Sequence, residues 1–193
     1  MEICIFSTMI KKGFFVLLMI MVTIGKGHAQ EWNQDNLKTS VTFKIKNFGI
    51  TVNGRFHNID VKTNLDTDKL SESYLNAFIA VPSIATGIED RDKHLLEEEY
   101  FNASTYHNIT FVTTKIEKST QGTYFLRANL TIKGITKKVT VPINFQQTDH
   151  NIMIQAAFEI NRRDFNVGGG SMIVSKKVKI HVQFSHFSVT QKQ

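Results

Sequence analysis

The feature that most limits how this chain can fold is the spacing of its apolar residues, which recur at every second position. Apolar and polar residues alternate over 138–145, 152–160 and 178–184, and more weakly over 41–45 and 124–132. Because successive side chains of a strand point to opposite faces, this period gives each strand one apolar and one polar face. The sequence therefore predicts an all-β chain of antiparallel strands.

The positions of the alternating segments and of the turn residues between them predict eight strands. Turn signals such as Asn47-Phe48-Gly49 and Lys133-Gly134 separate several of them. The exception is the charged segment 88–101, which we expect to form one short helix in a connection. Strands with one apolar face can form a sandwich or a barrel, and closure into a barrel removes exposed edges. The strands are expected at about 39–47, 52–65, 74–81, 109–117, 123–132, 138–146, 152–160 and 176–190.

The inward-facing residues of such a barrel either fill it or line a cavity. At about eight strands both outcomes occur, and the alternation leaves them open. A membrane-spanning barrel is disfavoured, because the chain has one Trp and four Tyr, too few for aromatic girdles. The residues expected to face inward, and to line any cavity, are Val41, Phe43, Ile45, Leu126, Leu130, Val141, Ile143, Phe145, Ile154, Phe158, Ile180, Val182 and Phe184.

The start of the chain has the pattern of a secretory signal peptide. Lys11 and Lys12 precede an apolar run over 14–24, and small residues follow up to Ala29. The apolar run, at about 11 residues, is too short to span a bilayer as a helix. We therefore expect a signal over 1–29 and one domain over 30–193, exported to the periplasm or secreted. The only cysteine, Cys4, lies in the signal, so the exported domain would have no disulfide.

No motif in the sequence predicts catalysis, a metal site or a cofactor. Ser83, Asp92 and His94 are residue types of a hydrolase triad, but no Gly-x-Ser-x-Gly elbow accompanies them. The histidines lack the spacing of zinc ligands. The net charge of +6 is spread along the chain instead of forming a basic stripe, which argues against nucleic-acid binding. A lipid-modifying enzyme that uses His94 with Ser83 or Asp92 remains the least favoured alternative.

A group of polar residues in two connections has two interpretations. Arg91 and Arg162 could form salt bridges with Asp92 and Asp164 that tie loops together. They could instead belong to a polar rim at a barrel mouth that meets a lipid head group, because arginine suits phosphate. The candidate rim residues are Ser83, Thr86, Arg91, His94 and Arg162.

Several segments, in order along nearly the whole domain, resemble the YceI-like family of exported proteins associated with polyisoprenoids and related lipids. The resemblance implies an eight-stranded, lipocalin-like antiparallel barrel, with a helical segment beside it and an amphiphile in an apolar pore. It assigns no catalytic residue. The matching segments are 41–49, 52–56, 83–87, 91–95, 109–111, 130–136 and 160–165.

The resemblance favours an open cavity over a filled barrel, and so favours a lipid-binding protein. The expected partner is one long-chain lipid, an isoprenoid, a quinone-like molecule or a fatty amphiphile, held for transport, storage or sequestration. No cofactor and no nucleic acid are expected, and a homodimer is left open. The alternative function is a secreted structural or interaction barrel with a filled core and no ligand.

Overall fold

The computed structural model describes residues 32–34, 39–148 and 151–188, and all the strands among them belong to one antiparallel sheet. The expected signal, 1–29, lies outside the described residues. The sheet contains 11 strands in the order β4-β5-β7-β8-β9-β10-β11-β2-β3-β6, with β1 paired to β11. The strands are β1 (Trp32–Gln34), β2 (Ser40–Asn47), β3 (Ile50–Phe56), β4 (Ile59–Thr63), β5 (Leu75–Ala80), β6 (Ile84–Ala85), β7 (Asn108–Lys118), β8 (Tyr124–Ile132), β9 (Ile135–Gln147), β10 (Asn151–Asn161) and β11 (Val174–Ser188).

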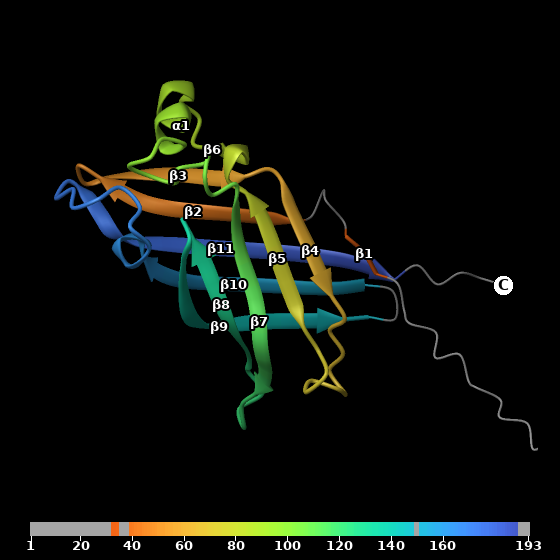
Figure 1. The fold of residues 1–193 in the computed structure, drawn as a ribbon. Coiled ribbons are helices and arrows are strands. Elements are labelled where there is room, and N and C mark those ends of the chain that lie inside the picture. Colours follow the sequence, from red (N-terminus) through yellow and green to blue (C-terminus); the bar gives the residue numbers. More distant parts are fainter. Residues whose placement is uncertain (1–31, 35–38, 149–150, 189–193) are drawn as a thin grey trace, which may run out of the picture.

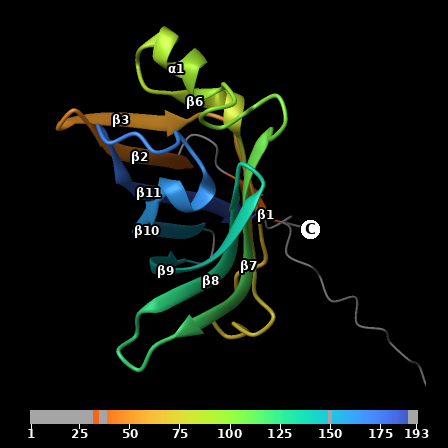
Figure 2. The ribbon, with the colours of Figure 1, turned by 60° about the vertical axis from the view of Figure 1, so that its left-hand side comes forward.

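The sheet curls into a barrel, which a single bent segment closes (Figures 1 and 2). The strands β3 and β4 are separated only by His57 and Asn58, yet β3 pairs with β2 and β4 pairs with β5, toward opposite ends of the strand order. The His57 N–H donates to the Ser83 carbonyl at 3.1 Å, and the Ala80 N–H donates to the Asn58 carbonyl at 3.0 Å. These bonds fix the corner at which the barrel closes.

The all-β barrel and its one short helix are as the sequence predicted, whereas the number of strands differs. The expected strand 52–65 is two strands, β3 and β4, because the chain bends at His57 and changes its pairing partner. The short strands β1 and β6 were not predicted, because two or three residues are too few to show alternation. The helix α1 (Glu89–Leu95) lies in the connection where a helix was expected, above β3 and β6 in Figure 1.

Two tight hairpins confirm the turn signals of the sequence. In the β2–β3 turn Phe48 and Gly49 have φ values of 50° and 78°, and in the β8–β9 turn Lys133 and Gly134 have values of 49° and 73°. Positive φ at both central residues is typical of the two-residue turns that match the twist of paired strands. The Phe48 turn places an aromatic side chain at the end of a hairpin, where it is exposed.

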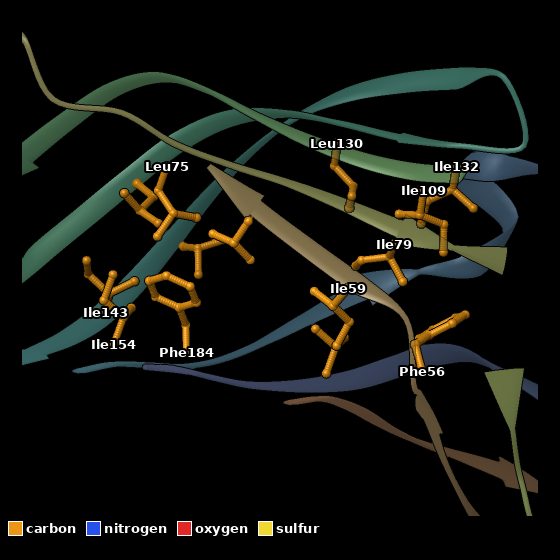
Figure 3. Close-up of a cluster of buried hydrophobic side chains, with 14 of the residues drawn as sticks. Phe56, Ile59, Leu75, Ile79, Ile109, Leu130, Ile132, Ile143, Ile154 and Phe184 are labelled. Carbon is orange, nitrogen blue, oxygen red and sulfur yellow. The ribbon is translucent and has the colours of Figure 1, made fainter. Parts of the chain in front are cut away.

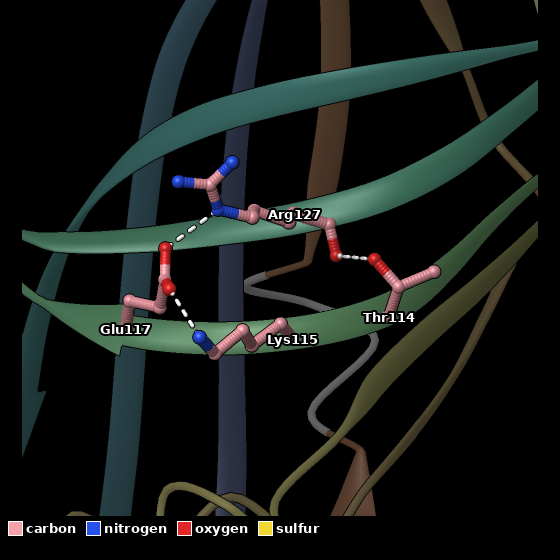
Figure 4. Close-up of polar contacts among 4 residues, drawn as sticks. All are labelled: Thr114, Lys115, Glu117 and Arg127. Atoms are coloured by element: carbon pink, nitrogen blue, oxygen red, sulfur yellow. Dashed lines mark hydrogen bonds and ion pairs between the residues drawn. The ribbon is translucent and has the colours of Figure 1, made fainter.

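On the outer face of the barrel a charged cluster joins β7 to β8 (Figure 4). The carboxylate of Glu117 accepts from Lys115 Nζ at 2.6 Å and from Arg127 Nε at 2.5 Å. Hydrogen bonds from Lys115, and to a lesser extent from Arg127, lower the pKa of Glu117. Thr114 occupies a bulge here and donates to the Arg127 carbonyl at 3.0 Å. Such exposed pairs add little stability and serve mainly to align the two strands.

None of the helices in the described part of the chain has the length and apolarity needed to cross a bilayer.

Candidate functional site: an apolar cavity in the barrel

The inward faces of the strands enclose a cavity of about 340 Å³. Its lining is almost wholly aliphatic and aromatic and comes from both halves of the barrel, for example from Val41 on β2, Ile79 on β5, Leu130 on β8 and Phe158 on β10. The volume lies within the range of small-molecule sites, which are mostly apolar with a few convergent polar groups. The interior of this barrel is therefore suited to an apolar ligand.

The two ends of the cavity differ in how tightly they are packed. At one end Leu75, Ile143, Ile154 and Phe184 are buried against one another and form a packed floor (Figure 3). Toward the other end the inward side chains of β2, β10 and β11 are only half-buried, although they also line the cavity. We call this accessible end, which includes Asn47 and Val174, the mouth. The half-buried side chains are Phe43, Ile45, Phe158, Ile160, Val178 and Ile180.

All the residues expected to line a cavity do so in the structure, except Phe145. The ring of Phe145 packs instead against Tyr124, with the ring centroids 5.7 Å apart. None of the lining residues predicted from the sequence lies in the wall formed by β3, β4, β5 and β7, where Phe56, Ile59, Ile79 and Ile109 line the cavity. The sequence contains a signal for this wall. The apolar residues Phe56 and Ile59 are three positions apart instead of two, and this break in the alternation marks the bend between β3 and β4.

One wall of the cavity depends on a glycine that faces an aromatic ring. Gly54 on β3 is the cross-strand partner of Phe43 on β2. A Cβ at Gly54 would lie 2.2 Å from Cζ of Phe43, so the far end of the ring occupies the space that a side chain at position 54 would need. Phe43 also contacts Phe56, with centroids 5.8 Å apart. The glycine thus leaves room for the Phe43 ring beside β3.

Gly54→Ala is expected to push the Phe43 ring into the cavity, lowering stability by about 1–3 kcal/mol because of overpacking. Binding of any ligand that fills this part of the cavity should weaken in parallel. Thermal unfolding and ligand titration of the single variant and of Gly54→Ala/Phe43→Leu would check this. The smaller leucine side chain at position 43 should restore much of both losses, and two independent, additive effects would contradict the account.

The connection between β6 and β7 covers part of the cavity. Leu95, Tyr100 and Phe101, in and after α1, contribute to its lining. Phe101 packs edge-on against Phe56 at 6.3 Å between centroids, and Tyr100 packs against His94 at 4.9 Å. The helical segment therefore builds one side of the mouth.

Three of the candidate rim residues, Thr86, Arg91 and His94, come together beside this segment and line the cavity. Arg91 donates through Nε to the Thr86 hydroxyl at 2.6 Å and through Nη2 to the Thr86 carbonyl at 2.9 Å. The Thr86 hydroxyl in turn donates to Asp92 Oδ1 at 2.5 Å. Within the described ranges Arg91 has no ion pair with a carboxylate, so the salt bridge to Asp92 considered from the sequence is absent. The guanidinium is oriented by Thr86 while its charge is not neutralised directly.

The other two candidate rim residues, Ser83 and Arg162, have structural contacts. Ser83 does not line the cavity: its hydroxyl donates to the Ala80 carbonyl at 2.7 Å and accepts from the His57 N–H at 3.2 Å. His94 Nδ1 lies 2.9 Å from Glu97 Oε2, so Ser83 and His94 are engaged with different neighbours. This arrangement gives no support to a triad built on Ser83.

Arg162 lines the cavity but uses its guanidinium within the protein. Its side chain is 5% exposed, and its nitrogens donate to backbone carbonyls at distances between 2.7 Å and 3.2 Å. Burial lowers the pKa of this guanidinium, yet arginine remains charged at any physiological pH. The salt bridge from Arg162 to Asp164 considered from the sequence is absent from the described residues, and Asp164 Oδ1 accepts from Asn161 Nδ2 at 3.0 Å. The carbonyls belong to Val167, Gly168, Gly169, Ser171, Val174 and Ser175.

The loop over 166–173 is thus wrapped around one buried cation. It lies between the 3-10 turn Arg162–Phe165 and β11, and Phe165 and Val167 also line the cavity. The Gly168 N–H donates to the Glu99 carbonyl at 2.9 Å, which joins the loop to the helical connection. Arg162 therefore positions one side of the mouth and is not available to a head group.

Asn47, at the end of β2, is a polar lining residue that the sequence reasoning did not select. Its Oδ1 is buried, and in the described part of the chain it has no hydrogen-bond partner. A buried acceptor without a partner is costly unless something else pairs with it. A ligand hydroxyl or amide at the mouth would supply that donor.

Among the described residues no group of His, Cys, Asp and Glu is arranged to hold a metal ion.

Comparisons with known proteins agree with this architecture. Residues 32–186 match the family model described as the YceI-like domain. A UPF0312 protein of Yersinia enterocolitica is 30% identical over 157 residues, which are 77% of this chain and 81% of that protein.

Solved structures have the same fold. BcnA of Burkholderia cenocepacia superposes with a TM-score of 0.75 at 27% identity, over 79% of this chain and 99% of that one. A polyisoprenoid binding domain from Saccharophagus degradans superposes with a TM-score of 0.66 at 16% identity, over 82% of this chain and 99% of that one, and supports the fold alone.

Proposed function

The chain belongs to the YceI-like family, and because its barrel encloses an apolar cavity we propose that it binds one long-chain amphiphile, an isoprenoid or a fatty chain. The cavity is the observation that carries the proposal. Burying apolar surface gains about 25 cal/mol per Å². A long hydrocarbon chain inside such a lining would therefore bind tightly without specific polar contacts along its length.

In this proposal the polar groups at the mouth select the head group. Arg91 is held by Thr86 and makes no direct ion pair with a carboxylate within the described ranges, so it suits a phosphate or a carboxylate. Asn47 would pair with a hydroxyl nearby. Selection would then be loose for the tail and stricter for the head.

The structural neighbour described as a polyisoprenoid binding domain supports an isoprenoid as the first ligand class to test. We further propose that the protein acts by binding and not by catalysis, and that it is exported by the signal at 1–29 for transport, storage or sequestration of its ligand. A filled, ligand-free interaction barrel is less well supported, given a cavity of about 340 Å³.

Native mass spectrometry of the purified protein, followed by organic extraction and lipid analysis, tests the proposal. A stoichiometric long-chain lipid would support it and identify the class. A ligand-free mass, together with failure to bind added prenyl and fatty ligands, would contradict it.

Arg91→Gln is expected to weaken binding of a prenyl phosphate about tenfold, as the loss of a charge-assisted hydrogen bond would. Binding of the corresponding uncharged prenyl alcohol should change little. The matched control is Lys93→Gln on the same helix, since Lys93 is exposed and pairs with Glu89. Titrating both ligands into both variants checks this; equal losses for the alcohol and the phosphate would contradict the assignment.

A further inference from the structure

Two neighbouring loops present exposed apolar side chains beyond the end of the barrel. Phe48 and Ile50 in the β2–β3 hairpin are 70% and 71% exposed, and Met172 and Ile173 in the loop before β11 are 97% and 49% exposed. The Phe48 N–H donates to the Ile173 carbonyl at 3.0 Å, which holds the two loops together. We call these four residues the apolar tip.

The apolar tip lies directly beside the mouth of the cavity. Asn47 and Val174 are paired across β2 and β11, and both line the cavity. Phe48 follows Asn47 in the chain, and Ile173 precedes Val174. A ligand that leaves the cavity between β2 and β11 would therefore meet the tip at once.

The strands that carry the tip have only basic charges. No Asp or Glu occurs from Ser40 to Ile59 or from Phe165 to the end of the chain. Lys44, Lys46, Lys176 and Lys179 are exposed on these strands. The acidic run at 97–99 meets the same loop at Gly168 and Gly169, ahead of the tip residues Met172 and Ile173 in the chain. Apolar side chains flanked by lysines are the combination that binds anionic membrane surfaces.

We propose that the apolar tip inserts into the surface of a bilayer that contains anionic phospholipid, so that the amphiphile passes between bilayer and cavity. This inference rests on the proposed function for the ligand, but the docking itself can be measured separately. A second copy of the chain fits the surface less well. A two-fold contact through the tip would bring the same lysines of both copies together.

The test is flotation with vesicles of phosphatidylcholine, with and without phosphatidylglycerol. The variant Phe48→Asn/Met172→Ser removes two tip side chains, and asparagine tolerates the positive φ at position 48. It should bind the anionic vesicles at least about tenfold more weakly than the unmodified chain. The matched control is Val112→Thr, an exposed apolar residue on β7 that is 39% exposed. Binding by the unmodified chain should also weaken as salt is raised.

A fluorescent prenyl ligand titrated in the absence of vesicles separates this inference from the proposed function. The tip variant should keep the affinity for this probe while its transfer of probe from vesicles slows. If the unmodified chain does not bind anionic vesicles, or if the tip variant binds them equally well, the inference fails even where probe affinity is retained. A dimer that Phe48→Asn/Met172→Ser breaks, with no vesicle binding, would instead make the tip an interface between copies.

Discussion

Phe158→Asp is expected to lower the affinity for a long-chain lipid by about 100-fold or more. Phe158 lines the half-buried part of the cavity on β10. A carboxylate there would have to lose water whenever an apolar chain entered, and burying an unpaired charge is very costly. Titration of a fluorescent prenyl or fatty ligand into the folded variant measures the loss.

The control for this variant is on the same strand. Ala157 is exposed on the outer face of β10, so Ala157→Asp adds the same charge one residue away without entering the cavity. We expect it to bind ligand as the unmodified chain does. Unchanged affinity of a well-folded Phe158→Asp would contradict a ligand held in the barrel, whatever the behaviour of the other sites.

Arg162→Ala is expected to lower the free energy of unfolding by about 3–5 kcal/mol, because several carbonyls lose a charged donor in a buried place. For a domain of this size that corresponds to a fall in Tm on the order of 10 °C. The loop over 166–173 should also become accessible to protease, since the guanidinium binds four of its carbonyls. Thermal unfolding and limited proteolysis measure the two effects.

Arg163→Ala provides the comparison. Arg163 is exposed and donates to the carbonyls of Gly170 and Ser171, so water can replace it. Its loss should cost less than about 1 kcal/mol. If the two variants were equally stable, the buried guanidinium would not be what holds the loop.

The antiparallel strands could be predicted from the sequence, because β8 to β11 are long and alternate from Tyr124 onward, while the family resemblance implied their closure into a barrel. The strands of the other half were harder to predict, because Phe56 and Ile59 both face inward although they are three positions apart. A prediction that assumes unbroken alternation takes the segment 52–65 for a single strand. The bend is explained by strand pairing: β3 pairs with β2, whereas β4 pairs with β5.

The polar residues show a different limit. Arg91 and Arg162 looked equivalent in the sequence, since each has an aspartate nearby. In the structure Arg91 is held by Thr86 and faces the cavity, whereas Arg162 is surrounded by carbonyls of its own loop. Every residue carries a backbone carbonyl, so the identities of the residues do not show which carbonyls converge on Arg162.

The pairing of β2 with β11 has a consequence for how the chain acquires its fold. Thr42 and His181, partners in this pairing, are 139 residues apart in sequence. Contacts between such distant segments form late, because the intervening chain must be ordered first. During synthesis β2 would have no partner on this side until nearly the whole domain had emerged, leaving its edge and the apolar wall open. We therefore expect slow closure as the last step of folding, and a need for protection from aggregation until β11 is in place.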